Sequence, residues 1–168
     1  MTSKPILALS ATVALIVGTL ATIGWPPRPR LIWNDSASAP IGLWSVTPDS
    51  PVDRGDMVVA QLAAPWRSLA ARRYYLPANV PLIKRVAAIA GDHVCANDRG
   101  VFVNGALVAV PRSIDGAGRA MPSWRGCTRL TNDAVLLLMD GPASFDGRYF
   151  GPTESRHIIG KAHPLWLR

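Results

Sequence analysis

An uncharged apolar stretch near the amino terminus constrains this chain most. Residues 6–24 carry no charged side chain and are mostly Leu, Ile, Val and Ala. The stretch is close to the ~20 residues that cross a bilayer core as a helix. Trp25 follows where an interfacial aromatic residue would lie, and Pro26 and Pro27 stop a helix from continuing. We therefore expect a cytoplasmic tip at residues 1–5, a transmembrane anchor at 6–25 and one periplasmic domain at 26–168.

Two other interpretations of this stretch stay open. A secretory signal that is later removed is also apolar, although its apolar core usually spans only ~7–15 residues. A buried helix of a soluble domain would normally keep a polar face, which this stretch lacks. Anchor and secretory signal both export the remainder of the chain. The flanking charges do not decide the orientation, because Lys4 precedes the stretch and Arg28 and Arg30 follow it.

Short apolar runs between turn residues predict a mainly antiparallel β domain. The 15 Pro and 14 Gly of the 168 residues are spread along the chain, as turn-rich β proteins require. Asn104-Gly105 between apolar runs predicts a two-residue hairpin turn. Only residues 65–75 have a helix-like composition in the exported part, and residues 111–126 are expected to form an irregular loop. The expected strands are at residues 41–46, 57–62, 82–88 and 135–139.

The basic character of the chain does not indicate a nucleic-acid partner. The formal net charge is +7 and the pI is near 10.3, but the Lys and Arg residues are scattered. Residues 72–75, Arg-Arg-Tyr-Tyr, form the one basic and aromatic cluster, and no helix-turn-helix or zinc-finger spacing accompanies it. A basic face would suit anionic membrane lipid, at roughly 1 kcal/mol per well-placed charge.

The two cysteines, Cys95 and Cys127, lie in no metal-ligand or CxxC spacing. In an exported domain such a pair is by default a disulfide. Two buried free thiols are the alternative. The three histidines show no triad or metal pattern, so we expect neither a metal nor a cofactor.

Two segments together carry a possible catalytic chemistry. Residues 34–44 place Ser36 and Ser38 among small residues before a Pro-x-Gly turn, which alone would also describe a linker. Residues 82–92 place Lys84 in an apolar strand, where desolvation lowers a lysine pKa, although an exposed edge lysine is the alternative. A serine hydroxyl needs a base, and a neutral lysine can be that base. Ser-Lys dyads are a recognised variant of the catalytic triad.

The sequence resembles the signal peptidase I (S26) family, and more closely its conjugative-transfer branch, the TraF-type maturation peptidases. Five segments carry the resemblance in the family's order, after an amino-terminal anchor. They are Ser36 to Trp44, Arg54-Gly55-Asp56-Met57-Val58-Val59, Ile83-Lys84-Arg85-Val86 with Gly91-Asp92, residues 144–152, and Ile159-Gly160-Lys161-Ala162.

The resemblance implies a role for each matching residue. Ser38 matches the nucleophile and Lys84 the general base. Ser36 and the backbone N–H of Ser38 match the oxyanion hole. The residues expected to support the site are Ser144, which orients the lysine, the ion pair of Asp146 and Arg148, and Arg85.

Some positions depart from the housekeeping signal peptidases. Those enzymes usually read Ser-Met-x-Pro, where this chain has Ser38-Ala39-Pro40, and tend to have Asp-Ser-Arg, where it has Asp146-Gly147-Arg148. Both departures favour the conjugative branch and leave the substrate open.

The resemblance further implies a signal-peptidase-like fold in the bacterial inner membrane, with its catalytic domain in the periplasm. The expected partner is an exported precursor, a secreted protein or pro-pilin, cut after small residues. Hydrolysis and cyclisation of the substrate are both compatible with the sequence. A catalytically inactive component of a secretion apparatus is the alternative that is not an enzyme.

Overall fold

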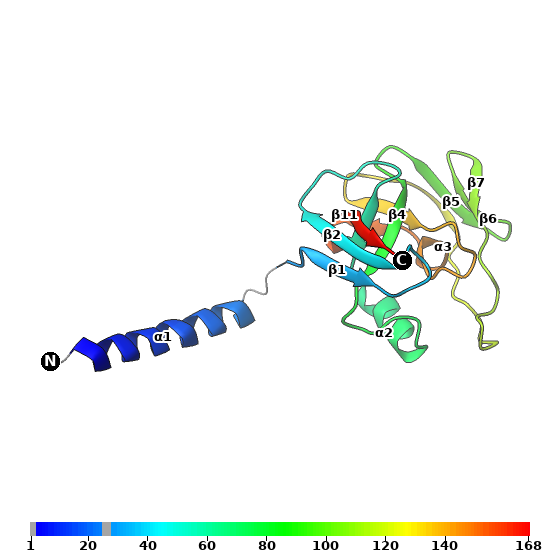
Figure 1. Cartoon of the computed structure of the whole chain (residues 1–168). Helices are drawn as coiled ribbons and strands as arrows, with labels where there is room; N and C mark the ends of the chain where they lie inside the picture. Colours follow the sequence, from blue (N-terminus) through cyan, green and yellow to red (C-terminus); the bar gives the residue numbers. More distant parts are fainter. Residues whose placement is uncertain (1–2, 25–27) are drawn as a thin grey trace.

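The structure is a computed structural model of the 168-residue chain. It describes residues 3–24 and 28–168, with side chains of the first helix described from residue 8 onward. Helix α1 (Ser3–Gly24) extends away from the β domain (Figure 1), and all of its described side chains are exposed. Within the described part of the chain, no helix is both long and apolar enough to cross a membrane. The span expected at residues 6–25 lies partly outside the described residues and stays a prediction.

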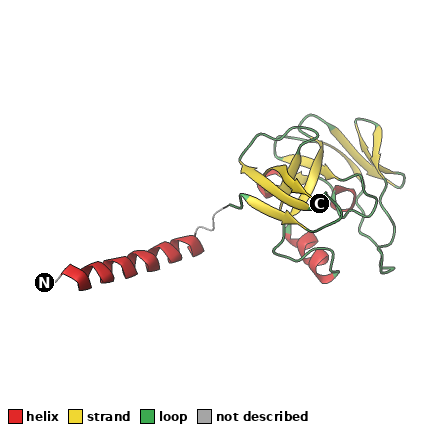
Figure 2. Ribbon diagram, in the orientation of Figure 1, coloured by secondary structure: helices red, strands yellow, loops and turns green. Residues whose placement is uncertain are grey.

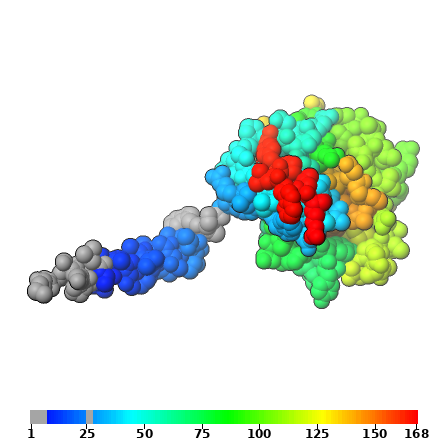
Figure 3. All heavy atoms as spheres, viewed as in Figure 1, coloured from blue at the N-terminus to red at the C-terminus, as the bar shows by residue number. Residues whose placement is uncertain are grey.

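Seven strands form the main sheet, and every pairing in it is antiparallel (Figure 2). The order across the sheet is β1-β2-β11-β3-β4-β9-β10, so the carboxyl-terminal strand lies between β2 and β3. Figure 3 shows the carboxyl-terminal residues in red on the visible face, against the cyan atoms around β2. The strands are β1 (Leu31–Asn34), β2 (Gly42–Pro48), β3 (Met57–Ala60), β4 (Leu82–Ala88), β9 (Ala134–Leu138), β10 (Thr153–Glu154) and β11 (Ile158–Leu167).

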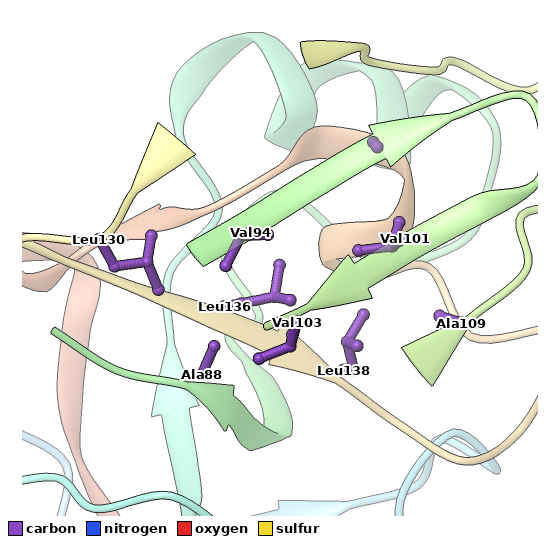
Figure 4. Close-up of a cluster of buried hydrophobic side chains, with 9 residues drawn as sticks. Ala88, Val94, Val101, Val103, Ala109, Leu130, Leu136 and Leu138 are labelled. Carbon is purple, nitrogen blue, oxygen red and sulfur yellow. The ribbon is translucent and has the colours of Figure 1, made fainter. Parts of the chain in front are cut away.

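A second, four-stranded sheet packs against one end of the main sheet. Its order is β7-β6-β5-β8, with β5 (His93–Asn97), β6 (Gly100–Val103), β7 (Ala106–Ala109) and β8 (Gly126–Arg129). Figure 4 shows Val94, Val101 and Val103 of this small sheet beside Leu136 and Leu138 of β9. Each such side chain stabilises the packing by about 1.5–3 kcal/mol when fully buried. The small sheet is therefore fixed to the strand that leads into the candidate site.

Helix α2 (Ala64–Arg72) begins with a proline in its first turn, where the missing N–H costs nothing. It ends at Arg72; Tyr74, two residues later, has a left-handed backbone (φ 59°), and the N–H of Tyr75 donates to the carbonyl of Ala70. The two shorter helices are α3 (Gly147–Phe150) and the 3-10 helix η1 (Ser155–His157). Ala70 of α2 packs against Phe145 and Tyr149, so α2 lies against the segment that carries α3.

The mainly antiparallel β fold expected from the sequence is confirmed. The predicted hairpin turn is present, with positive φ at Asn104 (51°) and Gly105 (84°). The segment expected to be irregular, 111–126, contains one isolated bridge and the first residue of β8. The sequence predicted neither of the helices α3 and η1, and it did not predict the strands β1, β5, β8, β10 and β11.

Candidate active site

Asn34, the last residue of β1, organises the loop that carries the two serines. Its side chain is buried, and its Nδ2 lies 3.0 Å from each of the carbonyl oxygens of Ser36, Ala39 and Pro40. Its Oδ1 accepts a hydrogen bond from the N–H of Ser36 at 3.2 Å. One amide side chain therefore links both ends of this loop and fixes its path.

The fixed loop brings the two serine side chains together. The Oγ atoms of Ser36 and Ser38 are 2.9 Å apart, and the N–H of Ser38 donates to Ser36 Oγ at 3.3 Å. The two groups expected to form an oxyanion hole are therefore neighbours beside the nucleophile candidate. Such donors act best when they are held in place before the reaction begins.

Strand β4 places Lys84 against this loop. Successive residues of a strand point to opposite faces, so Leu82 and Lys84 face the cleft while Ile83 packs in the core. Lys84 is only 1% exposed. Its Nζ donates to Ser38 Oγ at 2.7 Å and to Ser144 Oγ at 3.0 Å. The structure thus brings together three residues that are far apart in the sequence.

The surroundings of Lys84 favour its neutral form. Burial lowers the pKa of Lys84 to about 8; the Asp146 carboxylate opposes this shift and the Arg148 guanidinium adds to it. A free lysine has a pKa near ~10.4, so an ordinary lysine would hold its proton at pH 8. At that pH about half of the Lys84 side chains can accept a proton.

The ion pair of Asp146 and Arg148 supports the part of the chain that carries Ser144. Arg148 Nε lies 2.8 Å from Asp146 Oδ1, and both side chains are almost fully buried. The pair also reaches Met139, whose N–H donates to Asp146 Oδ2 at 3.1 Å and whose carbonyl accepts from Arg148 at 2.5 Å. These contacts tie the start of α3 to the chain just after β9. Ser144 lies between the two and is held in position with them.

Close packing explains why the middle residue of Asp146-Gly147-Arg148 is a glycine. A Cβ atom at position 147 would lie 2.8 Å from the carbonyl oxygen of Leu137, closer than such contacts allow. The carbonyl of Gly147 also accepts a hydrogen bond from the indole of Trp124 at 3.0 Å. The serine that housekeeping signal peptidases tend to have at this position would therefore not fit here without a shift of β9.

The structure does not bring Arg85 to the site, which corrects the expectation from the sequence. Arg85 follows Lys84 in β4 and points to the other face, where it pairs with exposed Asp140 at 3.0 Å. The positive charge that lowers the pKa of Lys84 belongs to Arg148 instead. Arg85 was expected to assist Lys84 because it is the next residue in the strand. Successive residues of a strand point to opposite faces, so the Arg85 side chain points away from the site.

An open cleft of about 530 Å³ contains Ser38 and Lys84. Strand β9 pairs with β4 only from Arg85 onward, while β3 covers the other edge of β4. Among the described residues, no strand pairs with residues 82–84 on the β9 side. This free edge can accept an extended peptide by strand addition, in which backbone hydrogen bonds supply affinity.

The disulfide expected between Cys95 and Cys127 is confirmed. With His93 these residues form the one cluster, in the part of the chain that the structure describes, whose ligand atoms are close enough for a metal ion. The two sulfur atoms are bonded to each other, so neither is free to be a thiolate ligand. None of the three histidines lines the cleft that contains Lys84.

Comparison with known proteins agrees with the expected family. The model of the family described as "Signal peptidase, peptidase S26" matches residues 4–167. The chain belongs to the signal peptidase S26 family. A "Probable conjugal transfer protein TraF" of Sinorhizobium fredii is 37% identical over 178 residues, covering 96% of this chain and 89% of its own length. A "Plasmid transfer protein TraF" of Escherichia coli is 37% identical over 159 residues, covering 87% of this chain and 86% of its own length.

Among solved structures, a signal peptidase I of Enterococcus faecalis V583 is similar to this member of the family. It is 17% identical, the match covers 68% of this chain and 98% of that chain, and the TM-score is 0.38.

Two features of the site were missed in the sequence. Asn34 is the first residue of the serine segment 34–44. A polar residue two positions before Ser36 is a signal that the sequence offers. The Arg-Arg-Tyr-Tyr cluster is visible in the sequence, but its contacts are not predictable from it. Arg73 and Tyr75 turn toward Asp115 above the cleft, while Tyr74 is 95% exposed.

Proposed function

We propose that this chain is a serine endopeptidase in which Ser38 is the nucleophile and Lys84 is the general base. One observation carries the proposal: Lys84 Nζ lies 2.7 Å from Ser38 Oγ, on a buried side chain whose pKa is lowered to about 8. Family membership supports peptidase chemistry. A desolvated lysine beside a serine hydroxyl is an activated nucleophile of the Ser-Lys type.

The reaction is acyl transfer. Neutral Lys84 takes the hydroxyl proton as Ser38 Oγ attacks the carbonyl carbon of the scissile bond. The N–H of Ser38 and the hydroxyl of Ser36 receive the negative charge that develops on the carbonyl oxygen. The lysine ammonium then gives its proton to the leaving amine, and an ester remains on Ser38. Water, deprotonated by Lys84, attacks the ester and releases the acid and the serine.

We further propose that the substrate is an exported precursor protein, such as a pro-pilin, processed after a small residue during conjugal transfer. The names of the relatives support this setting. The free edge of β4 at residues 82–84 supports binding of an extended segment. The amino terminus of the substrate could replace water as the final nucleophile, and the product would then be a cyclic peptide.

Labelling with an acylating serine probe tests the chemistry. The full chain in detergent should be labelled, whereas Ser38→Ala and Lys84→Met should not be. Ser36→Ala should cleave a precursor ~10²–10³-fold more slowly, because it loses one oxyanion donor. Ser123→Ala changes an exposed serine away from the site and is the matched control. A chain without Ser38-dependent label would be an inactive component. Mass spectrometry separates the two products, because a cyclic peptide is lighter by one water.

We also propose that residues 6–25 anchor the chain in the bacterial inner membrane, with residues 26–168 in the periplasm. The apolar, uncharged sequence of this segment and the exposure of its described side chains support an anchor. The disulfide supports an oxidising compartment. Protease added to spheroplasts should digest the domain. Protection of the intact chain would contradict this placement.

A further inference from the structure

The disulfide joins two cysteines that face each other across paired strands. Cys95 of β5 is the direct partner of Cys127 of β8, with Cα atoms 4.0 Å apart. Val94 and Ala96, on either side of Cys95, are buried in the core, so the disulfide lies on the outer face of the small sheet. All four residues of β8 are exposed, and this strand is at the edge of its sheet. A reductant in solution can therefore reach the sulfur atoms.

His93 completes a cluster of three possible metal ligands on this outer face. It precedes Cys95 by two residues in β5, so both side chains point to the same side. His93 Nδ1 lies 3.5 Å from Cys95 Sγ, and the ligand atoms of His93, Cys95 and Cys127 all lie within 4.8 Å of one another. Two ligands of a tetrahedral Zn²⁺ are roughly 3.5 Å apart, given bond lengths of ~2.0–2.3 Å. Once the sulfur atoms are no longer bonded to each other, small side-chain movements bring all three atoms to these distances.

A dithiol opens this disulfide by thiol–disulfide exchange, to which exposed disulfides are the more susceptible. Cys127 is exposed and Cys95 is half-buried, so the attacking thiolate reaches Cys127 Sγ. A mixed disulfide forms on Cys127, the bond to Cys95 breaks, and its electron pair leaves on Cys95 Sγ beside His93. The second thiol of the reductant then displaces Cys127 as a thiolate. The dithiol loses two electrons and two protons and leaves as a cyclic disulfide, and the two cysteines gain both.

The charges around the reduced pair suit a divalent cation. Two thiolates cancel the charge of Zn²⁺, and the neutral imidazole of His93 adds a third ligand without changing that balance. Arg129 is the partner of His93 across the two strands and is exposed on the same face. Its positive charge favours the thiolate form of nearby cysteines, which is the form that binds metal. Two cysteines, one histidine and a water molecule are a known set of Zn²⁺ ligands.

We propose that His93, Cys95 and Cys127 form a binding site for Zn²⁺ when the disulfide is reduced by a dithiol. The ion then takes over the link between β5 and β8, so the small sheet keeps its edge strand in both redox states. None of these three residues lines the cleft that contains Lys84. The site is therefore separate from the proposed peptidase chemistry and does not depend on it.

Zinc titration of the reduced chain tests the site without requiring catalysis. The protein is the full-length chain in detergent, without a polyhistidine tag. A phosphine reduces it, because a phosphine leaves no thiol that would compete for the metal, and is then removed in the absence of oxygen. Zn²⁺ is titrated in competition with a chromophoric chelator. The reduced chain should bind about one Zn²⁺, whereas the oxidised chain should bind none at the same concentration, because a disulfide offers no thiolate.

Two histidine variants separate the site from binding by two thiols alone. His93→Ala removes the nitrogen ligand and should weaken the affinity for Zn²⁺ by at least ~10-fold, the lower limit of what loss of a residue that only supports a ligand costs. His163→Ala removes an exposed histidine of β11 and should leave the affinity unchanged. Both variants fold with the disulfide intact and are reduced afterwards, so neither depends on folding without the disulfide.

Urea denaturation gives a second measurement that a loose pair of thiols would not affect. Zn²⁺ should raise the urea midpoint of the reduced chain and leave that of the oxidised chain unchanged, because a ligand of the folded state stabilises it by mass action. Equal affinity of the wild type and His93→Ala would overturn the site. Equal affinity of the reduced chain in its folded state and in denaturing urea would overturn it as well. A disulfide that neither a dithiol nor the phosphine reduces in the folded chain would also contradict the proposal.

Discussion

The amine of Lys84 controls when the nucleophile can be activated. Its pKa of about 8 predicts that kcat/KM rises with pH and levels off above that value, because only the neutral amine can accept the Ser38 proton. Lys84→Arg should be inactive at every pH, since a guanidinium keeps its proton. The measurement is a pH profile of kcat/KM for both proteins. Appreciable turnover by Lys84→Arg would exclude Lys84 as the base.

Burial of Lys84 also makes the stability of the fold depend on pH. The pKa of Lys84 is about 8 in the folded chain and about 10.4 in the unfolded chain, so the unfolded chain binds more protons between these values. Stability should therefore rise with pH over this window, by about 3 kcal/mol in total. Lys84→Met should be more stable than the wild type at pH 7 and should lack this rise. Urea unfolding from pH 7 to 10.5 measures it, and the same rise in both proteins would contradict the assignment.

Asn34 determines whether the serine loop is correctly placed. Asn34→Leu keeps a similar volume but removes all four hydrogen bonds to the loop. We expect kcat to fall ~10²-fold, since a displacement of about 1 Å can have that effect, while KM changes little. Asn132→Leu changes an exposed asparagine and is the control. An unchanged kcat in Asn34→Leu would show that the loop holds its path without this side chain.

At the scale of elements, strand β4 was predicted with its observed bounds because an apolar run ends at clear turn residues. Strand β8 was missed because all four of its residues are exposed, so no alternating pattern marks it. It exists through pairing with β5, which tertiary structure supplies. Helix α3 has only four residues and is capped at its amino-terminal end by the buried Asp146. A sequence pattern cannot show that this carboxylate is buried.

The connection between β9 and α3 depends on a buried charge pair, and two arginines of the chain allow a matched test. Arg148→Ala would leave Asp146 buried without its partner, and we expect it to lower the free energy of unfolding by about 3–5 kcal/mol. Arg85→Ala breaks an exposed pair with Asp140 and should change it by less than about 1 kcal/mol. Urea denaturation of both variants compares them. Similar effects of the two substitutions would contradict the bracing role of Arg148.

At the scale of the whole molecule, the site is assembled from segments that the sheet order brings together. The serine loop, β4 and the chain after β9 are separated by 46 and 60 residues, counted from Lys84 to Ser38 and to Ser144. The family resemblance made it possible to predict from the sequence that these three segments lie together in the fold. The contact between Tyr75 and Asp115 at the cleft was not predictable in the same way, because these residues are 40 apart in the sequence and no motif links them.

The disulfide closes a loop that includes segment 111–121, part of which lines the cleft. Cys95 and Cys127 are 32 residues apart, and the loop that they close contains β6, β7 and segment 111–121. Replacing both with serine should lower the free energy of unfolding by about 3–4 kcal/mol in the chain-entropy model, because the unfolded chain gains freedom. The small sheet should loosen first, since β8 is exposed and is held through its pairing with β5.

This order of loosening has a measurable consequence for the two parts of the site. The serine loop and β4 lie outside the closed loop, so the C95S/C127S protein should still be labelled at Ser38 at moderate temperature. Its binding of an extended peptide in the cleft should be lost at a lower urea concentration than the labelling is, because part of segment 111–121 lines that cleft. Titrations with guanidinium and with urea, monitored separately by peptide binding and by labelling of Ser38, give the two midpoints. Coincident midpoints would mean that the closed loop and the dyad unfold as one cooperative unit.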